Sequence, residues 1–259
     1  MQHKPVTHPL GLPFIELQSI DSTNNYALTQ VRERMAEHGT AFFAHEQTAG
    51  RGQMGRRWIS QKDANIAMSL VLRPGPLQIS QQFYLSACIA VAVMKSLISH
   101  AGNDMRIKWP NDLYWQDRKI GGILIENIIG SQSLHSSSAW QWAVAGIGIN
   151  VNQTSFSPDL PNPVSLKQIT GKHFNTVQLA KDLCGEINGW FIKLLENGFD
   201  EIYTLYNERM YKLDETVKLK KNNVVLQTSV KGVSRTGELI THNSVLEERF
   251  AFYEISWLL

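Results

Sequence analysis

The segment from Gly50 to Trp58, GRGQMGRRW, restricts the fold of this chain more than any other feature. Its first eight residues contain three glycines and three arginines, a composition that favours neither a packed helix nor a packed strand. Glycine lets the backbone approach a ligand closely, and arginine presents a planar, permanent charge suited to phosphate or carboxylate. We therefore expect a ligand-binding loop here.

Two nucleotide-binding motifs match this loop in part. The GxGxxG spacing from Gly50 to Gly55 is that of dinucleotide-binding folds, but the residues that follow lack a helical apolar period, and no acidic residue stands between Asp63 and Asp104. The same two glycines have P-loop spacing, but arginines follow where lysine and serine or threonine are required. A bare surface loop is the remaining alternative, and Trp58 with three arginines argues against it.

Composition excludes several classes of protein. A net charge of +2 over 259 residues gives no general basicity for nucleic-acid binding. Cys88 and Cys184 lie in apolar helical patterns and are expected to be buried free thiols, as in a reducing cytosol. The histidines show no metal-ligand spacing, no apolar run reaches membrane-spanning length, and the start lacks a signal-peptide pattern, so a cytoplasmic protein without zinc or membrane contact is expected.

The order of elements predicts an α+β fold, because strands are grouped between helices instead of alternating with them. The predicted helices span 21–37, 80–100, 177–197 and 199–211, and the predicted strands span 14–17, 40–45, 64–72, 106–109, 119–129 and 140–151. The last two strands read as a hairpin around a polar loop at 130–138, and Asn111-Asp112 reads as a turn. The helix at 80–100 is apolar around most of its surface and should be central.

The pattern changes after Tyr211. Short strands are expected at 216–219, 224–230, 238–241 and 250–255, which makes a β module of four or five strands that leans on the main domain. We predict a main domain over residues 1–211 and a small β domain over residues 212–259.

Two further segments carry chemistry. KWPND at 108–112 combines a cation, a proline-fixed turn, an amide and a carboxylate, and KIGGILIE at 119–126 opens an apolar strand with a lysine and two glycines. Each alone is more often a turn or a bulge than a site. Together with the loop they provide cations, small residues, an amide and an acid, which indicates an anionic, nucleotide-like ligand and Mg²⁺.

These segments, together with GIGINVN at 146–152, resemble the biotin protein ligase family in order and spacing across the whole chain. The resemblance implies a mixed-sheet catalytic domain of the class II aminoacyl-tRNA synthetase and biotin ligase type, followed by a small C-terminal SH3-like β-barrel. It also implies an activity: biotin and MgATP give biotinyl-5′-AMP, and the biotinyl group then passes to a lysine of a biotin carboxyl carrier domain.

The resemblance assigns roles to residues of this chain. The implied catalytic residues are Lys119, Arg51 and Asp112, the last orienting Lys119 or holding Mg²⁺ unless it is simply a turn aspartate. The implied biotin-binding residues are Ser22, Thr23, Asn24, Gln47, Gly50, Arg51, Gly52, Lys119, Gly121 and Gly122, although Ser22 and Thr23 also read as helix caps. The implied ATP-binding residues are Arg51, Arg56, Trp58, Asn111, Lys119 and Asn150. Gly50, Gln53, Met54 and Gly55 belong to a flexible loop that we expect the ligands to order.

Some expectations concern differences within the family. Some members carry arginines at the positions of Gln53 and Met54. Neutral residues there remove charge that helps to retain the adenylate, so both are assigned to the loop and Gln53 is given no catalytic role. The catalytic pattern begins near Phe14, which predicts a monofunctional ligase without the DNA-binding domain of the repressor type. The protein should be a monomer or a homodimer that pairs sheet edges, with the 140–151 strand as a candidate edge.

Two alternatives remain. A lipoate–protein ligase shares the related fold and the acyl-adenylate chemistry, and the Arg-Arg-Trp and Lys-Trp-Pro-Asn-Asp segments favour biotin over it. A non-catalytic biotin-binding regulator is the other, and the cations at Arg51, Arg56 and Lys119 argue against it.

Overall fold

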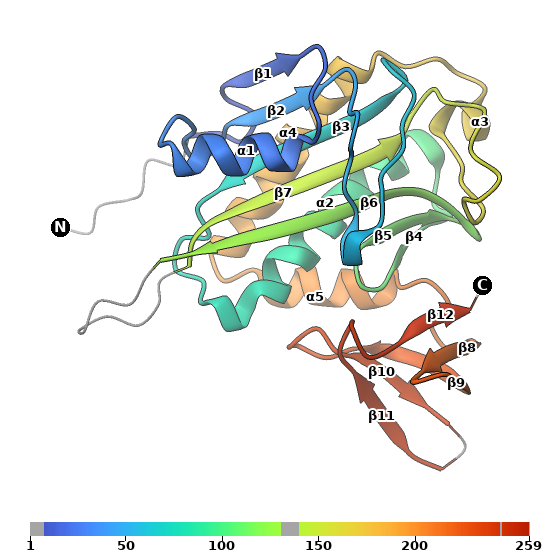
Figure 1. Ribbon diagram of the computed structural model, residues 1–259. Coiled ribbons are helices and arrows are strands. Elements are labelled where there is room, and N and C mark those ends of the chain that lie inside the picture. Colours follow the sequence, from blue (N-terminus) through green and yellow to red (C-terminus); the bar gives the residue numbers. More distant parts are fainter. Residues whose placement is uncertain (1–7, 131–139, 244, 259) are drawn as a thin grey trace.

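The computed structural model describes residues 8–130, 140–243 and 245–258. These residues form two sheets, one of seven strands and one of five, together with the helices that pack on them (Figure 1). All but Gly130 of the polar loop predicted at 130–138 lies outside the described residues.

The larger sheet has the strand order β1-β2-β3-β7-β6-β5-β4. Its first pair is parallel and all its other pairs are antiparallel, so the prediction of a mixed sheet is confirmed. The strands are β1 (Phe14–Leu17), β2 (Ala41–Ala44), β3 (Asn65–Leu72), β4 (Met105–Lys108), β5 (Asp112–Trp115), β6 (Arg118–Ile129) and β7 (Trp140–Asn150).

The position predicted for β7 is wrong. This strand pairs with β3 over eight residues and with β6 on its other side, so it lies in the middle of the sheet and cannot pair with a second copy. Its near-continuous apolar run fits burial on both faces. The edges are β1 and β4, and the β4 edge is partly covered because Ile107 N donates to Arg209 O (2.8 Å) and Tyr211 N donates to Ile107 O (2.9 Å).

Helices cover the two faces of this sheet unequally. Alternate residues of β3 belong to different apolar clusters: Met68 and Leu70 pack with the helices α2, α4 and α5, whereas Val71 packs with α1. Since successive residues of a strand point to opposite faces, α1 lies on the face opposite the other three helices (Figure 1). The bounds are α1 (Thr23–Arg32), α2 (Gln82–Ala101), α4 (Thr176–Leu195) and α5 (Phe199–Glu208).

Helix α2 is the centre of the core, as its apolar circumference predicts. Its residues from Ala87 to Met94 are at most 1% exposed. The segment Ile79–Ala101 is long and apolar enough to cross a membrane, the one such helix among the described residues, but most of it is buried inside the protein. Cys88 on this helix and Cys184 on α4 are buried free thiols, as predicted.

Several predicted elements differ from the structure. Helix α1 ends at Arg32 instead of Glu37, because Arg34 adopts a left-handed φ of 60°. Asp112 begins β5, which pairs on both sides, so only Asn111 of the predicted turn lies in one. Helix α3 (Leu166–Thr170) was not predicted because it is a single capped turn too short for an apolar period.

The C-terminal residues form a five-stranded antiparallel sheet, which agrees with the predicted small β module. Its strand order is β11-β10-β9-β8-β12, with β8 (Thr216–Lys221), β9 (Val224–Val233), β10 (Leu239–His242), β11 (Glu247–Phe250) and β12 (Ser256–Leu258). The strand predicted at 250–255 is wrong, since residues 252–254 form a turn between β11 and β12. The proposed domain boundary at residues 211 and 212 stays a prediction.

Partly buried hydrogen bonds join this C-terminal module to the main sheet and its helices. Trp109 Nε1 donates to Gly237 O (2.9 Å), and Tyr203 OH donates to Val233 O (2.7 Å). Trp109 itself is 2% exposed. The module is therefore held against the end of β4 and against α5.

Candidate active site

One cavity of about 850 Å³ collects most of the predicted site residues, from segments that lie far apart in the sequence. The predicted residues that line it are Ser22, Thr23, Asn24, Gln47, Arg51, Gly52, Gln53, Met54, Arg56, Trp58, Asn111, Asp112, Lys119, Gly122 and Asn150. Gly50, Gly55 and Gly121 are not among its lining residues. The C-terminal module contributes to it as well, through Phe252, Ile255, Ser256, Trp257 and Leu258.

The start of α1 forms one end of the cavity. Ser22 caps the helix, as its side chain accepts from Asn25 N. Thr23 N and Thr23 Oγ1 both lie within hydrogen-bond distance of Gln47 Oε1 (2.8 and 3.1 Å). Capping and ligand binding are compatible here, because hydroxyl lone pairs and the Gln47 Nε2 group remain for a ligand with N–H donors and a carbonyl.

The amide of Asn24 is committed to the protein itself. Ser69 Oγ donates to Asn24 Oδ1 (2.6 Å), and Asn24 Nδ2 donates to Glu126 Oε2 (2.9 Å). Asn24 is 3% exposed. This arrangement favours a positioning role for Asn24 over direct contact with biotin.

Arg51 forms a two-pronged ion pair with Glu126, at 2.8 Å (Nη2 to Oε1) and 3.1 Å (Nη1 to Oε2). Arg51 Nη1 also donates to Asn25 Oδ1 (2.6 Å). A guanidinium has five N–H donors, so two remain for a ligand. Glu126 therefore orients Arg51 toward the cavity and offsets its charge.

Lys119 and Asp112, which both line the cavity, form an ion pair with 2.6 Å between Nζ and Oδ1. The two residues come from adjacent strands, β6 and β5. Gly122 makes space for them, because a Cβ there would lie 3.1 Å from Asp112 Oδ1 and 3.5 Å from Lys119 Nζ. This pairing favours Asp112 as the residue that orients Lys119 over a simple turn aspartate.

Trp58 lies flat against the backbone of β7. A Cβ at Gly148 would be 2.5 Å from Trp58 Cε2, so only glycine admits the indole at this position. The amide nitrogens of the other two predicted nucleotide contacts are used internally: Asn111 Nδ2 donates to Ile123 O, and Asn150 Nδ2 donates to Val164 O (3.2 Å). Their amide oxygens have no hydrogen bond among the described residues and can accept one from a ligand.

The glycine-arginine loop is a small closed hairpin. Gly52 N donates to Arg56 O (2.7 Å), Trp58 N donates to Gly50 O (2.9 Å), and a turn of 3₁₀ helix covers Gln53–Gly55. Met54 at its tip is 68% exposed. The change in this loop on ligand binding stays a prediction.

Sequence reasoning assigned no site role to four residues that line the cavity or hold its lining. Lys108 and Trp257 line it, and Ser69 and Glu126 bind the lining residues Asn24 and Arg51. Lys108 and Glu126 belong to the segments at 108–112 and 119–126 that the sequence singled out, whereas Ser69 and Trp257 were missed. Ser69 could have been found from the sequence, since it is the one hydroxyl residue in the apolar strand 65–72. In the structure its side chain is fully buried. Burial lowers the pKa of the Lys108 ammonium to about 8; Asp112 opposes this shift, whereas Lys119 and Arg56 add to it.

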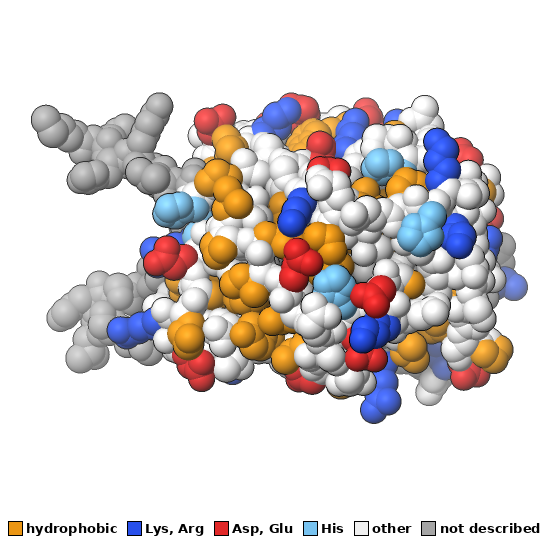
Figure 2. Space-filling view, turned by 90° about the horizontal axis from the view of Figure 1, so that it is seen from above, with side chains coloured by type: hydrophobic (Ala, Val, Ile, Leu, Met, Phe, Trp, Pro, Cys, Tyr) orange, Lys and Arg blue, Asp and Glu red, His pale blue; other side chains and the backbone are white. Residues whose placement is uncertain are grey.

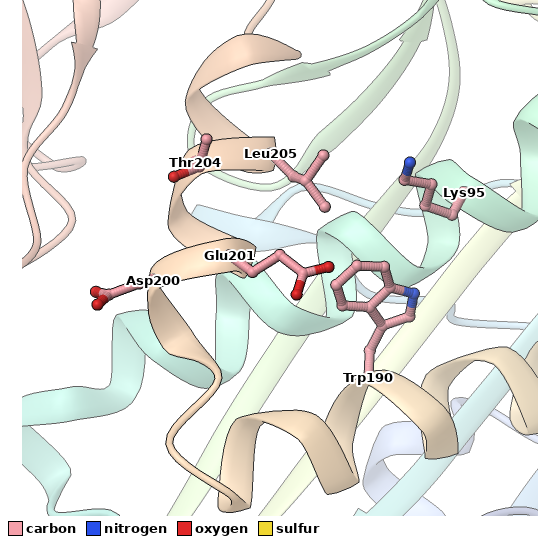
Figure 3. A pocket seen from close by; sticks show the side chains of 6 residues that line it. All are labelled: Lys95, Trp190, Asp200, Glu201, Thr204 and Leu205. Carbon is pink, nitrogen blue, oxygen red and sulfur yellow. The ribbon is translucent and has the colours of Figure 1, made fainter.

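A second depression, of about 520 Å³, lies away from these residues on the helical face. Figure 3 shows Lys95 from α2, Trp190 from α4 and Glu201 from α5 around it. None of the predicted site residues lines it. On the face seen from above, positive and negative side chains are interspersed, in line with the small net charge (Figure 2).

A mixed sheet that carries a cation-lined cavity, with a small β module at its rim, defines a protein with a preformed site for an anionic ligand. Comparison with known proteins specifies the class. Residues 16–142 match the model of the biotin/lipoate A/B protein ligase family. The bifunctional ligase/repressor BirA of Bacillus spizizenii is 32% identical over 240 residues, which are 90% of this chain and 70% of that protein.

The chain belongs to the biotin/lipoate A/B protein ligase family. The biotin–[acetyl-CoA-carboxylase] ligase of Paracoccus denitrificans is 31% identical and is covered over 92% of its length, against 86% of this chain. The biotin protein ligase of Aquifex aeolicus in complex with biotin and ATP has a TM-score of 0.77 at 28% identity, over 93% of this chain and 97% of that one. The predicted fold class is confirmed.

Proposed function

We propose that this protein is an ATP-dependent biotin–protein ligase. It activates biotin as biotinyl-5′-AMP and transfers the biotinyl group to a lysine of a biotin carboxyl carrier domain. The observation that carries the proposal is that one cavity contains three kinds of binding group. Thr23 and Gln47 provide polar groups, Lys119 provides a cation paired with Asp112, and the indole ring of Trp58 packs against Gly148. The relatives named as biotin ligases support the same activity.

In the first step the biotin carboxylate attacks the α-phosphorus of ATP and pyrophosphate leaves. Two unit charges about 4 Å apart repel by roughly 4 kcal/mol at an effective dielectric of 20, so the reacting anions need cations between them. Lys119 and the free donors of Arg51 provide them. Asp112 holds Lys119 at the place where negative charge accumulates in the transition state.

In the second step the amine of the acceptor lysine attacks the mixed-anhydride carbonyl, and AMP leaves. The adenine lies against Trp58, with the Asn111 and Asn150 oxygens as acceptors. The hairpin over Gly50–Trp58 covers the adenylate until the carrier lysine arrives.

The nucleotide of this reaction is the magnesium complex of ATP, and residues of the cavity would share in holding the metal. The described residues contain no cluster of three histidine, cysteine, aspartate or glutamate side chains that would hold a metal by itself. Mg²⁺ characteristically takes one or two carboxylates together with phosphate oxygens and water. Asp112 and Asp159, which both line the cavity, fit that requirement.

The test is carrier labelling. The protein is incubated with MgATP, a biotinyl carrier domain and either biotin or lipoate. Biotinylated carrier and pyrophosphate are expected with biotin. Labelling with lipoate instead would establish the lipoate ligase alternative. Biotin binding by calorimetry without pyrophosphate release would establish the non-catalytic regulator.

Other properties remain part of the proposal. We expect a cytoplasmic enzyme that does not bind DNA. For the oligomeric state, β1 is the open edge of the larger sheet, and it is only four residues long. Short edges resist strand pairing, which favours a monomer over a dimer that extends this sheet.

A further inference from the structure

Lys108 is a buried cation that none of the steps above uses. It ends β4, lines the same cavity and is only 8% exposed. Its ammonium lies between two aromatic rings, 5.3 Å from the ring centre of Tyr114 and 5.1 Å from that of Trp257. Tyr114 belongs to β5, and Trp257 belongs to β12 of the C-terminal module.

Within the part of the chain that the structure describes, no carboxylate forms an ion pair with the ammonium of Lys108. Asp112 lies directly opposite Lys108 in the β4–β5 register, but its Oδ1 is 2.6 Å from the Nζ of Lys119. Lys119 and Arg56 also repel Lys108. A buried charge without a partner is costly, and an apolar side chain of the same length would fill this space at lower cost.

Cation–π contacts alone do not account for this lysine. Such contacts stabilise a desolvated ammonium only modestly and leave its N–H donors without acceptors. A lysine that lines the cavity close to Lys119 and Arg56, with no ion-pair partner among the described residues, forms an incomplete anion site. The acceptors must come with the ligand.

The strand order indicates which anion. Lys119 lies on β6 and Lys108 lies on β4, two strands further along the order β7-β6-β5-β4. Lys108 is therefore farther than Lys119 from β7 and from the α1 end of the sheet. The biotin end of the cavity is at α1, so Lys108 lies beyond the reacting carboxylate and α-phosphate. That is the place for the part of ATP that leaves as pyrophosphate.

We propose that Lys108 binds the β- and γ-phosphates of ATP and that Trp257 of the C-terminal module holds its side chain in position. This rests on the proposed ligase function. It makes the C-terminal module part of the nucleotide site, since the aromatic contact exists only while the module is docked. Trp257 Nε1 is buried and has no hydrogen-bond partner among the described residues.

The test compares Lys108→Met and Lys108→Arg with wild type. Methionine keeps the length and removes the charge, whereas arginine restores the charge. Calorimetry with magnesium pyrophosphate and with biotin measures binding without turnover. Pyrophosphate affinity should fall roughly ten- to hundredfold in Lys108→Met, with biotin affinity unchanged and substantial recovery in Lys108→Arg.

Lys95→Met is the matched control, because Lys95 lies on the helical face shown in Figure 3 and touches neither ligand. Trp257→Leu should weaken pyrophosphate binding less than Lys108→Met does. If Lys108→Met does not fold, Lys108→Gln takes its place with the same measurements. Unchanged pyrophosphate affinity in the folded neutral variant overturns the proposal. A wild-type protein that binds both ligands but never labels a carrier overturns the ligase function and leaves the Lys108 assignment standing.

Discussion

At the scale of single residues, the cavity depends on which charges are paired with one another and which are left for a ligand. Lys119 is held by Asp112, and Arg51 is held by Glu126. Each acid fixes the direction of a cation whose remaining donors face the cavity. Such preorganised donors stabilise a transition state without rearrangement at the moment of reaction.

Lys119→Ala should therefore lose most of the adenylation activity. Removing a donor from a preorganised anion site characteristically lowers the rate about 10²- to 10³-fold. Biotin-dependent ATP–pyrophosphate exchange measures this step directly. Wild-type exchange in the variant would remove Lys119 from its proposed role, and Lys95→Ala serves as the control.

Lys108 should destabilise the fold. Because burial lowers its folded-state pKa from 10.5 to about 8, the folded protein binds fewer protons than the unfolded chain between these pH values. Its cost is complete below about pH 8 and declines as the pH rises toward 10.5. Lys108→Met should raise the free energy of unfolding at pH 7 by about 1–2 kcal/mol, and by less at pH 10. Urea unfolding at both pH values measures this, and an equal gain at both would contradict it.

At the scale of elements, β7 and the glycine-arginine hairpin act together. The hairpin is fixed at its end by Trp58, whose ring occupies the space that any side chain at Gly148 would need. A central strand with a glycine that lines the cavity thus forms the floor of the proposed nucleotide site.

Gly148→Val should displace Trp58 and raise the KM for MgATP roughly tenfold, a loss of about 1.4 kcal/mol of binding free energy. Biotin affinity should change little, because the Thr23 end is untouched. Gly185→Ala is the control, since a Cβ at that position on α4 meets nothing within 4 Å. Unaltered KM in Gly148→Val would show that Trp58 does not contact the nucleotide.

The hairpin also predicts a protection pattern. Arg56 and Arg57 are exposed, so trypsin should cut there in the free protein. Biotin with MgATP should slow this cleavage several-fold if the ligands order the loop over the adenylate. Equal cleavage with and without ligands would mean that the loop does not respond to them.

At the scale of the whole molecule, the two sheets share one site. The C-terminal module lines the cavity with Trp257 and is held to the main domain by the Trp109–Gly237 hydrogen bond. Loosening that junction should affect stability and nucleotide binding together.

Trp109→Phe keeps the aromatic packing and leaves the partly buried Gly237 carbonyl without its donor. We expect a loss of about 1–2 kcal/mol in the free energy of unfolding and a higher KM for MgATP. The control is Trp190→Phe, whose Nε1 donates to the exposed carboxylate of Glu186 and should matter far less. If Trp109→Phe is destabilised but has a normal KM for MgATP, the junction between the modules does not affect nucleotide binding.

The sequence by itself determined the long elements and the chemistry-bearing segments. Helix α2 and the β6–β7 hairpin carry their periods locally, and the glycine-arginine loop excludes regular structure by composition. The resemblance added the residue types that a biotin and ATP site requires. All of these signals lie within short stretches of chain.

Only the tertiary structure decided which strand is central and which charges pair. The sequence of β7 is compatible with an edge strand or a middle strand, because its apolar run does not determine which strands pair with it. In the structure it pairs with β3 and β6. Arg51 and Glu126 are 75 residues apart, and Lys108 meets Trp257 across two modules. Burial and charge pairing arise from packing between distant segments, so no local pattern records them.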